Sequence, residues 1–331
     1  MRLSMKFTNY IRIVVSNLLN NVHLLGKCRL CEEFLALNPH ANQIKESIIF
    51  VDQIKKNLVE LYYAIHENLS TEYANELKYL QSRKVLDMIP YEQQKKIAEP
   101  IQAEFDSKKK LPFVVHNGKR LYFPKHWSLD ESKSQYQYFV ERENLLGGNY
   151  TSKAPHQYQT KIFQIESGDV LLDVGCAEGL VALDVIEKVK RAILFESDPI
   201  WEAPLKATFE PYKDKVKIIN KWVSDIDNET SVTLRTSTQG LEKETFFVKM
   251  DIEGAEELVV KGNSDFFKNR KVKAACCTYH KYNHFEILNE TFMKWGYSTE
   301  PSDGYILCFM DNVFAPPYFR KGLIRATNIK Q

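Results

Sequence analysis

Residues Val170–Glu196, VLLDVGCAEGLVALDVIEKVKRAILFE, decide the fold that this sequence predicts. The apolar run Val170–Val174 is typical of a buried parallel strand, and it contains a single acid, Asp173. A glycine loop, a helix with an apolar side and a second apolar strand ending at Glu196 follow it. This order of elements predicts the first unit of a parallel sheet that binds a ligand at its strand ends.

The glycine loop predicts a ligand that carries an adenosine. Its pattern, G-x-x-x-G from Gly175 to Gly179, is not the full dinucleotide fingerprint G-x-G-x-x-G, so a pyrophosphate is not the first expectation. Glu196, at the end of the second strand, can accept both hydroxyls of a ribose. S-adenosylmethionine (SAM), an adenosine without phosphates, fits this pattern. The alternative is a tight turn that binds nothing.

The composition fits a globular, intracellular protein. Its 331 residues suffice for about two domains, and 44% of them are hydrophobic. A net charge of +2, from 45 basic and 43 acidic residues, argues against nucleic-acid binding driven by bulk charge. The cysteines indicate a reduced protein, and they are Cys28, Cys31, Cys176, Cys276, Cys277 and Cys308. Cys28 and Cys31 have no second pair at zinc-binding spacing, so we interpret them as helix residues.

The region from residue 1 to about 110 is predicted to be helical. Residues 10–26 are too polar to span a bilayer, so we expect a helix packed on the protein, with a helix resting on a membrane surface as the alternative. Residues 44–69 and 71–88 carry apolar residues at helical spacing. No catalytic constellation occurs here, and we expect oligomerisation, partner docking or covering of the acceptor site. The expected location is cytoplasmic, with peripheral membrane association as the alternative.

Residues 111–150 are predicted to lead into the catalytic domain, which we expect to span residues 151–331. Two β-rich runs around Asn117-Gly118 predict a hairpin. Ser128–Glu131 is a capping box that opens a helix, and we expect this helix to reach Leu146.

The polar loop of residues 149–158 is expected to precede a further helix, which in turn leads to the strand at Val170. Its place in the sequence brings it near the ligand. Lys153 and His156 are therefore candidates for contact with cofactor or acceptor, the alternative being plain loop and helix-cap residues.

Strands and helices alternate again after Glu196, and several strands end at a polar residue. Because ligands bind at the carboxyl ends of parallel strands, this shared placement indicates one site. The strand-end residues are Asp173, Glu196, Asp225, Asp251 and His280. Two runs, 297–300 and 304–310, are too close for a crossover helix and are expected to pair antiparallel. The sequence therefore predicts an α/β fold with a doubly wound, mostly parallel sheet and one antiparallel end strand.

Residues 248–256, VKMDIEGAE, with Leu258 and Lys261-Gly262, resemble the signature of FkbM-type methyltransferases. These are class I SAM-dependent enzymes, typically O-methyltransferases. The resemblance covers roughly residues 140–315, and it implies a class I methyltransferase domain that uses SAM. Two departures concern the acceptor side: the segment from Asp225 to Thr245 is short, and Thr278 replaces an acidic residue of the family pattern.

The resemblance also implies which residues bind the cofactor. The DVGCAEG run looks like the family's first motif, and Glu196 matches its ribose-binding acid. Val223, Ser224 and Asp225 match a short motif near the adenine. With neighbouring positions, the candidate cofactor-binding residues are Asp173, Gly175, Cys176, Ala177, Glu178, Gly179, Glu196, Ser197, Ser224, Asp225 and Asp251.

His280, Asp251 and Glu253 are the candidate catalytic residues. His280 matches a histidine that often ends the family's fifth strand, and its ordinary pKa suits a base that takes a proton from an acceptor hydroxyl. We expect Asp251, on the adjacent strand, to fix the imidazole tautomer. Glu253 is expected to bind the SAM amino group, to orient His280 or to hold the acceptor, the alternative being a cap for the helix near Ala255. Lys249 is interpreted as structural.

The family resemblance implies a hydroxyl acceptor on a sugar, a glycan or a natural product. Two other classes of protein remain alternatives. A nicotinamide-dependent oxidoreductase would also use Glu196, but the incomplete glycine fingerprint and the antiparallel strand argue against it. A noncatalytic module would keep the fold, and the retained polar strand ends argue against that class. No metal site is expected.

Overall fold

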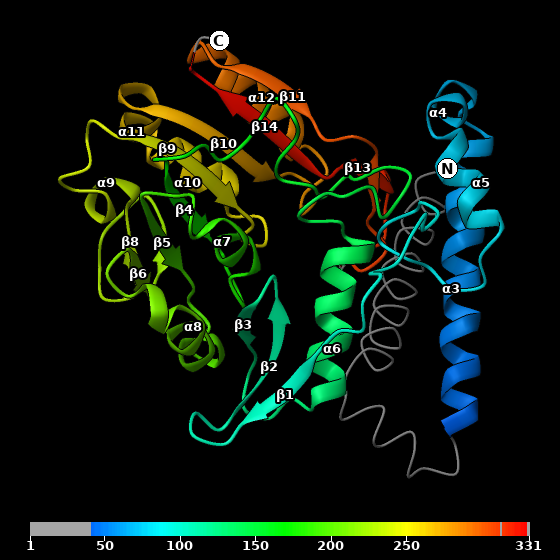
Figure 1. The fold of residues 1–331 in the computed structure, drawn as a ribbon. Coiled ribbons are helices and arrows are strands. Elements are labelled where there is room, and N and C mark those ends of the chain that lie inside the picture. The colour runs from blue at the N-terminus through cyan, green and yellow to red at the C-terminus, as the bar shows by residue number, and fades with distance from the viewer. Residues whose placement is uncertain (1–40, 312, 330–331) are drawn as a thin grey trace. The chain divides into compact units, whose positions relative to one another are not determined.

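The computed structural model describes residues 41–311 and 313–329 (Figure 1). The predictions for residues 10–26 and for Cys28 and Cys31 therefore lie outside the described residues. The chain forms two compact units. The first runs to Glu92 and includes Tyr305–Arg320, and the second comprises Gln93–Gly304 and Lys321–Gln331.

From residue 41 onward, the first unit contains three helices and a short β-pair. Its elements are α3 (Ala41–Ala64), α4 (Glu67–Glu72), α5 (Ala74–Gln81), β12 (Tyr305–Leu307) and β13 (Phe319–Lys321). Tyr63 and Leu80 from the helices pack with Phe309 and Phe319 in its core. Lys55 is completely buried, and its Nζ donates to the Phe309 carbonyl at 2.7 Å. No helix in the described ranges is long and apolar enough to cross a membrane.

The central sheet of the second unit is mostly parallel, as expected. Its strands are β4 (Val170–Val174), β5 (Arg191–Phe195), β6 (Val216–Ile219), β9 (Thr245–Met250), β10 (Lys271–Cys277), β11 (Ser298–Pro301) and β14 (Leu323–Thr327). They lie in the order β11-β14-β10-β9-β4-β5-β6. Only β14 runs antiparallel to its neighbours, and it pairs with both β10 and β11.

The expected antiparallel pairing of residues 297–300 with 304–310 is wrong. β11 pairs with β14, whereas β12 pairs with β13. The physical reason is that Leu307 and Phe309 are buried in the core of the first unit, so this stretch is not available to the central sheet. The two units divide after Glu92, earlier than the boundary expected near residue 110. The reason is that β1 (Ala103–Asp106) pairs with β2 (Leu111–His116), so both strands belong to the second unit.

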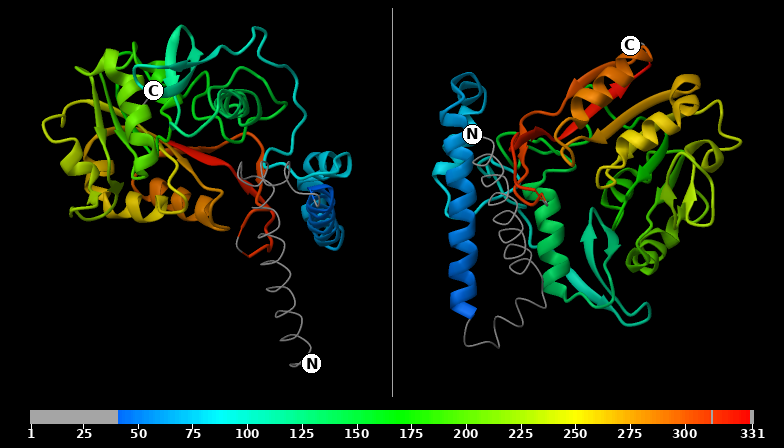
Figure 2. Two further views of the ribbon diagram at one scale, coloured as in Figure 1. Left: turned by 90° about the horizontal axis from the view of Figure 1, so that it is seen from below. Right: turned by 180° about the vertical axis from the view of Figure 1, so that it is seen from behind.

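Helices cover both faces of the central sheet (Figures 1 and 2). On one face lie α7 (Leu180–Val185) and α8 (Glu202–Phe209), which share a core with Leu171 and Phe247. On the other lie α10 (Glu256–Gly262), α11 (Ser264–Asn269) and α12 (His284–Lys294). The alternation of side chains along each strand supplies both cores, which explains why strands such as β4 are apolar throughout.

The predicted hairpin and capping box are confirmed. β2 and β3 (Lys119–Tyr122) pair around Asn117 and Gly118, whose φ values of 49° and 77° are those of a type I′ turn. Ser128 and Glu131 form the reciprocal cap of α6 (Leu129–Gln137). The helix continues only as a π-helical turn, Tyr138–Arg142, and so ends earlier than expected.

Two other segments differ from expectation because polar side chains bind the local backbone. The helix expected before β4 is absent between residues 158 and 169, where Gln159 Oε1 accepts from Ile165 N at 2.9 Å. The strand expected over residues 231–235 is only β8 (Ser231–Val232). Thr233 then caps α9 (Leu234–Ser237), and β8 pairs with β7 (Trp222–Val223).

The strand order reverses between β4 and β9, and this reversal positions the site. From β4 the chain adds β5 and β6 on one side, whereas β9 returns to the other side of β4 and is followed by β10. Ligands bind in the crevice at the carboxyl ends of strands at such a reversal. Gly175, directly after β4, has φ 73°, and a Cβ there would lie 2.0 Å from the Asp251 carbonyl oxygen. The loops after β4 and β9 therefore contact each other backbone to backbone.

This contact gives the first testable prediction. Gly175→Ala and the control Gly168→Ala both add a side chain at positive φ, which costs about 1–2 kcal/mol. Only at Gly175 does the added Cβ meet the backbone, because at Gly168 no described atom lies within 4 Å. We expect Gly175→Ala to lose about 1–3 kcal/mol more unfolding free energy than the control, measured by urea denaturation. Equal losses would show that the two loops can move apart freely.

Candidate functional site

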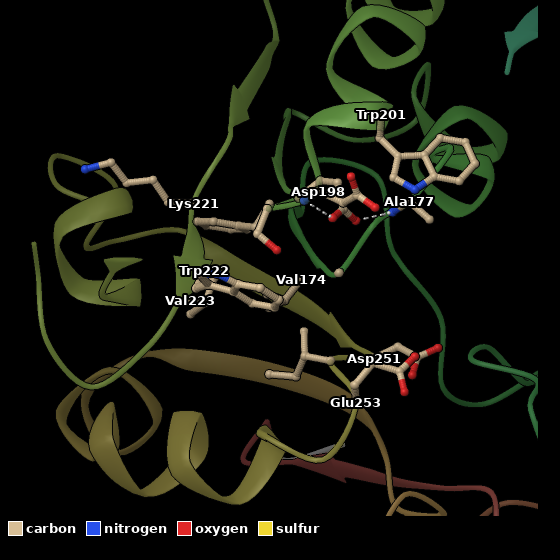
Figure 3. A pocket seen from close by; sticks show the side chains of 14 residues that line it. Val174, Ala177, Asp198, Trp201, Lys221, Trp222, Val223, Asp251 and Glu253 are labelled. Atoms are coloured by element: carbon tan, nitrogen blue, oxygen red, sulfur yellow. Dashed lines mark hydrogen bonds between the residues drawn. The ribbon is translucent and has the colours of Figure 1, made fainter. Parts of the chain in front are cut away.

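A cavity of about 350 Å³ lies at the carboxyl ends of β4, β5 and β9 (Figure 3). Its lining includes six of the residues predicted from the sequence, namely Gly175, Ala177, Glu196, Ser197, Asp251 and Glu253. It also includes Val174, Phe195, Asp198, Trp201, Lys221, Trp222, Val223 and Ile252. The structure thus brings the loops after three strands to one concave site, where the strand order reverses.

Glu196 shapes the glycine loop. Its Oε2 accepts from Ala177 N at 2.9 Å and its Oε1 accepts from Asp198 N at 2.8 Å (Figure 3). These bonds tie the loop after β4 to the turn after β5. Because a carboxylate offers about four lone-pair sites, both oxygens can still accept a further hydrogen bond from the cavity.

Asp173 lies beneath the loop and is paired with Lys249. The two residues are direct neighbours on β4 and β9, and Lys249 Nζ lies 3.1 Å from Asp173 Oδ1. Lys249 Nζ also donates to the Gly175 carbonyl. Burial raises the pKa of Asp173, whereas burial lowers the pKa of Lys249 but is outweighed by the charges of Asp173 and Asp251, which raise it. The lysine that we interpreted as structural therefore stays charged and anchors the loop.

The other predicted cofactor residues lie outside the cavity lining. Cys176 and Glu178 are buried, and burial raises the pKa of Glu178 to about 7. Gly179 packs so closely on Phe209 that a Cβ would lie 2.8 Å from the ring.

Ser224 and Asp225 also lie outside the cavity lining. The two residues before them, Trp222 and Val223, line the cavity instead. The carbonyl of Ser224 accepts from Asn263 Nδ2 at 2.8 Å, and Asp225 packs against Gly262. Both residues are thus turned towards α10 and not towards the cavity.

His156 contacts Asp251, and this contact links the loop of residues 149–158 to the site. Asp251 Oδ2 accepts from the Tyr158 hydroxyl at 3.1 Å and lies 3.3 Å from His156 Nε2. On its other side, His156 Nδ1 lies 2.7 Å from Glu143 Oε2. Burial lowers the pKa of His156, but its electrostatic interactions with Cys277 and Glu143 and its hydrogen bond to Asp251 outweigh burial and raise that pKa well above its ordinary value. Lys153 is not part of this cluster, since it pairs with Asp303 at 3.3 Å.

Asp251 is held in its ionised form by its neighbours. Burial alone would raise its pKa, but the hydrogen bond and charge of His156 and the charges of His280 and Lys249 lower it. A carboxylate that stays ionised at the edge of a cavity can bind a cationic group of a ligand.

His280 contacts a carboxylate that the sequence analysis missed. Its Nδ1 lies 3.0 Å from Glu256 Oε1, whereas its Nε2 lies 3.5 Å from Asp251 Oδ1 and 3.7 Å from Glu253 Oε2. Glu256, which is completely buried, therefore lies closer to the imidazole than Asp251, the residue expected to fix it. Burial lowers the pKa of His280, but Glu256 and Asp251 raise it above its ordinary 6.5.

Glu256 also performs the capping that was the alternative role for Glu253. Ile252 N donates to Glu256 Oε1 at 3.0 Å, at the start of α10. The side chain of Glu253 is 91% exposed, and its φ of 56° turns the backbone back towards the helix. A signal for Glu256 existed in the sequence, because an acid in the first turn of a helix commonly accepts from backbone amides. Glu143 and Tyr158 carried no comparable signal.

No family model and no curated protein sequence matches the chain. Among solved structures, it is similar to the methyltransferase FkbM from Methylobacillus flagellatus, with 18% identity, a TM-score of 0.42, and coverage of 60% of this chain and 52% of that one. A putative transferase from Pyrococcus horikoshii shows 12% identity, a TM-score of 0.39, and coverage of 66% and 72%. A putative tRNA methyltransferase from Streptococcus pneumoniae, in complex with SAM, shows 11% identity, a TM-score of 0.33, and coverage of 50% and 69%.

The chain spans about half the length of the FkbM structure that it matches. At these identities and TM-scores the likeness is one of fold alone. The residues of the cavity therefore carry the functional argument.

The Asp173–Lys249 pair gives the second prediction. Lys249→Met leaves Asp173 buried without its counter-charge, which costs about 3–5 kcal/mol of unfolding free energy. Adding Asp173→Asn removes the uncompensated charge, so the double variant should be more stable than Lys249→Met alone. Urea denaturation of the three proteins measures both effects. If the second substitution lowers stability further, the loss in Lys249→Met comes from packing and not from charge.

Proposed function

We propose that the protein is a SAM-dependent methyltransferase that methylates a hydroxyl group of a sugar, a glycan or a natural product. One observation carries this proposal: the cavity at the strand reversal has Glu196 at the end of β5 and the ionised Asp251 at the end of β9. Glu196 suits the hydroxyls of a ribose, and Asp251 suits a cationic group such as the amino group of SAM.

The remaining lining of the cavity fits this cofactor. Trp222, Val223 and Ile252 supply apolar walls that suit an adenine, and a cavity of about 350 Å³ lies in the range of small-molecule sites. The loop from Gly175 to Ala177, held by Glu196 and Lys249, brings backbone close to the ligand. Bound SAM supplies a methyl group activated on a sulfonium, so positioning of the acceptor is the main task left to the protein.

We assign to His280 the role of the base that takes the proton of the acceptor hydroxyl. Its Nδ1 faces Glu256, which leaves Nε2 as the atom that can take a proton. Glu256 stabilises the positive charge that forms on the ring and so strengthens the base. Proton removal by a positioned base contributes about a hundredfold to ten-thousandfold in rate. The experiment that tests the whole proposal is a transfer assay with radiolabelled SAM against sugars, cell-envelope polysaccharides and hydroxylated natural products.

The third prediction concerns the cofactor. Glu196→Gln should weaken binding of S-adenosylhomocysteine (SAH) by about 1–3 kcal/mol, because the ribose hydroxyls lose a charged acceptor. Isothermal titration calorimetry measures it, with Glu202→Gln as control, since Glu202 lies on α8 outside the cavity lining and pairs with Lys206.

A thermal melt of Glu196→Gln is needed as well, because Glu196 also holds the amides of Ala177 and Asp198. Unchanged SAH affinity in a folded variant would remove Glu196 from the site. Binding of NADH, with none of SAH, would instead favour a nicotinamide-dependent oxidoreductase.

The fourth prediction concerns the pH dependence of turnover. His280 must be neutral to act as a base, and Glu256 and Asp251 hold its pKa above the ordinary 6.5. Turnover should therefore fall as the pH drops through this raised pKa, and Glu256→Gln should move the acidic limb to lower pH while slowing the reaction.

His280→Ala should abolish most turnover at every pH and leave SAH affinity nearly unchanged. The control is His126→Ala, because His126 precedes α6 and lies outside the cavity lining. A pH profile that keeps its acidic limb in His280→Ala would assign that limb to another group.

A further inference from the structure

Four polar groups converge on one point beside the cavity. They are His156 Nε2, Asp251 Oδ2, Cys277 Sγ and the Tyr158 hydroxyl. His156 Nε2 lies 3.3 Å from both Asp251 Oδ2 and Cys277 Sγ. The Tyr158 oxygen lies 3.0 Å from His156 Nε2, 3.1 Å from Asp251 Oδ2 and 3.8 Å from Cys277 Sγ. The ligand atoms of the histidine, aspartate and cysteine all lie within 4.8 Å of one another.

Five of the six separations lie close to the edges of a tetrahedral zinc site, and the sixth, between Asp251 and Cys277, is within 4.8 Å. Zinc binds nitrogen, oxygen and sulfur at about 2.0–2.3 Å, which places the ligand atoms of a tetrahedron about 3.3–3.7 Å apart. The observed distances of 3.0–3.8 Å between neighbouring atoms scatter around this range. Imidazole and thiolate ligands together select zinc over magnesium and calcium.

The surroundings of His156 and Asp251 also fit a metal ligand set. His156 Nδ1 lies 2.7 Å from Glu143 Oε2, so a carboxylate orients the imidazole and leaves Nε2 for the ion. Carboxylates that bond the free nitrogen of a zinc-binding histidine act in the same way. His156, Tyr158 and Cys277 are buried. The side chain of Asp251 is 21% exposed and lines the cavity, which provides a path by which an ion can enter.

We propose that His156, Asp251 and Cys277 bind one Zn²⁺ ion, with the Tyr158 hydroxyl at the fourth vertex and Glu143 orienting the histidine. The thiol proton of Cys277 and the proton on His156 Nε2 both leave to solvent when the sulfur and the nitrogen bind the metal. Asp251 reaches the ion through Oδ2, so its Oδ1 stays on the side of His280. The inference goes beyond the proposed function and does not depend on it, because metal binding is measured without SAM or an acceptor.

The test uses the full-length protein, stripped of metal with a chelator under reducing conditions. Titration with Co²⁺ is expected to give one equivalent of binding and a sulfur-to-cobalt charge-transfer absorption, which Zn²⁺ then removes by displacement. Cys277→Ser should abolish the absorption and weaken Zn²⁺ binding at least tenfold. Cys276→Ser is the matched control, because Cys276 is the neighbouring buried residue of β10 and belongs to the core on the other face of the sheet.

Two further measurements keep the test decisive if Cys277→Ser does not fold. Glu143→Gln should weaken Zn²⁺ binding by about 10- to 100-fold without removing a ligand. X-ray absorption of the zinc-loaded wild type should show one sulfur ligand. Two sulfur ligands would instead indicate a site that includes a cysteine other than Cys277, and absence of stoichiometric binding would mean that the cluster is held by hydrogen bonds alone. Either result overturns the proposal.

Discussion

The ion pair between Asp173 and Lys249 is the interaction on which the site depends. It joins β4 to β9 at the point where the strand order reverses, and Lys249 also holds the Gly175 carbonyl. A buried charge is tolerated only when it is paired, so each residue requires the other. The same lysine lowers the pKa of Asp251, which lines the cavity. One buried cation thus fixes the glycine loop and, after His156 and His280, helps to keep the carboxylate of Asp251 ionised.

From Asp251, acids and histidines alternate through the second unit. His156 contacts Glu143 on one side and Asp251 on the other. His280 in turn lies between Asp251 and Glu256 and contacts both. Each acid raises the pKa of the adjacent histidine, and each histidine lowers the pKa of Asp251. This row of groups explains how so many ionisable side chains share one buried region. It also separates two roles, because His156 is enclosed whereas His280 lies beside the exposed Glu253.

The first unit shows a different constraint, which acts through the order of the chain. Residues between β11 and β14 leave the second unit and contribute Leu307, Phe309 and Phe319 to a core with α3 and α5. The antiparallel strand of the central sheet is therefore reached only after this excursion. The local sequence pattern favours the nearest apolar run, residues 304–310, as the partner strand. Burial of this run in the core of the first unit prevents that pairing.

The sequence by itself determined what rests on local periodicity and turn chemistry. The strand before Gly175, the Asn117-Gly118 hairpin, the Ser128 cap and the mostly parallel sheet all follow from patterns within a few residues. Contacts between distant segments were decided only by the tertiary structure. Tyr158 reaches Asp251, about a hundred residues away, and Glu143 contacts the histidine that lies beside Asp251. Glu256 lies closer to His280 than Asp251 does. Such contacts depend on which strands become neighbours and on the paths of the loops, and no local pattern encodes either.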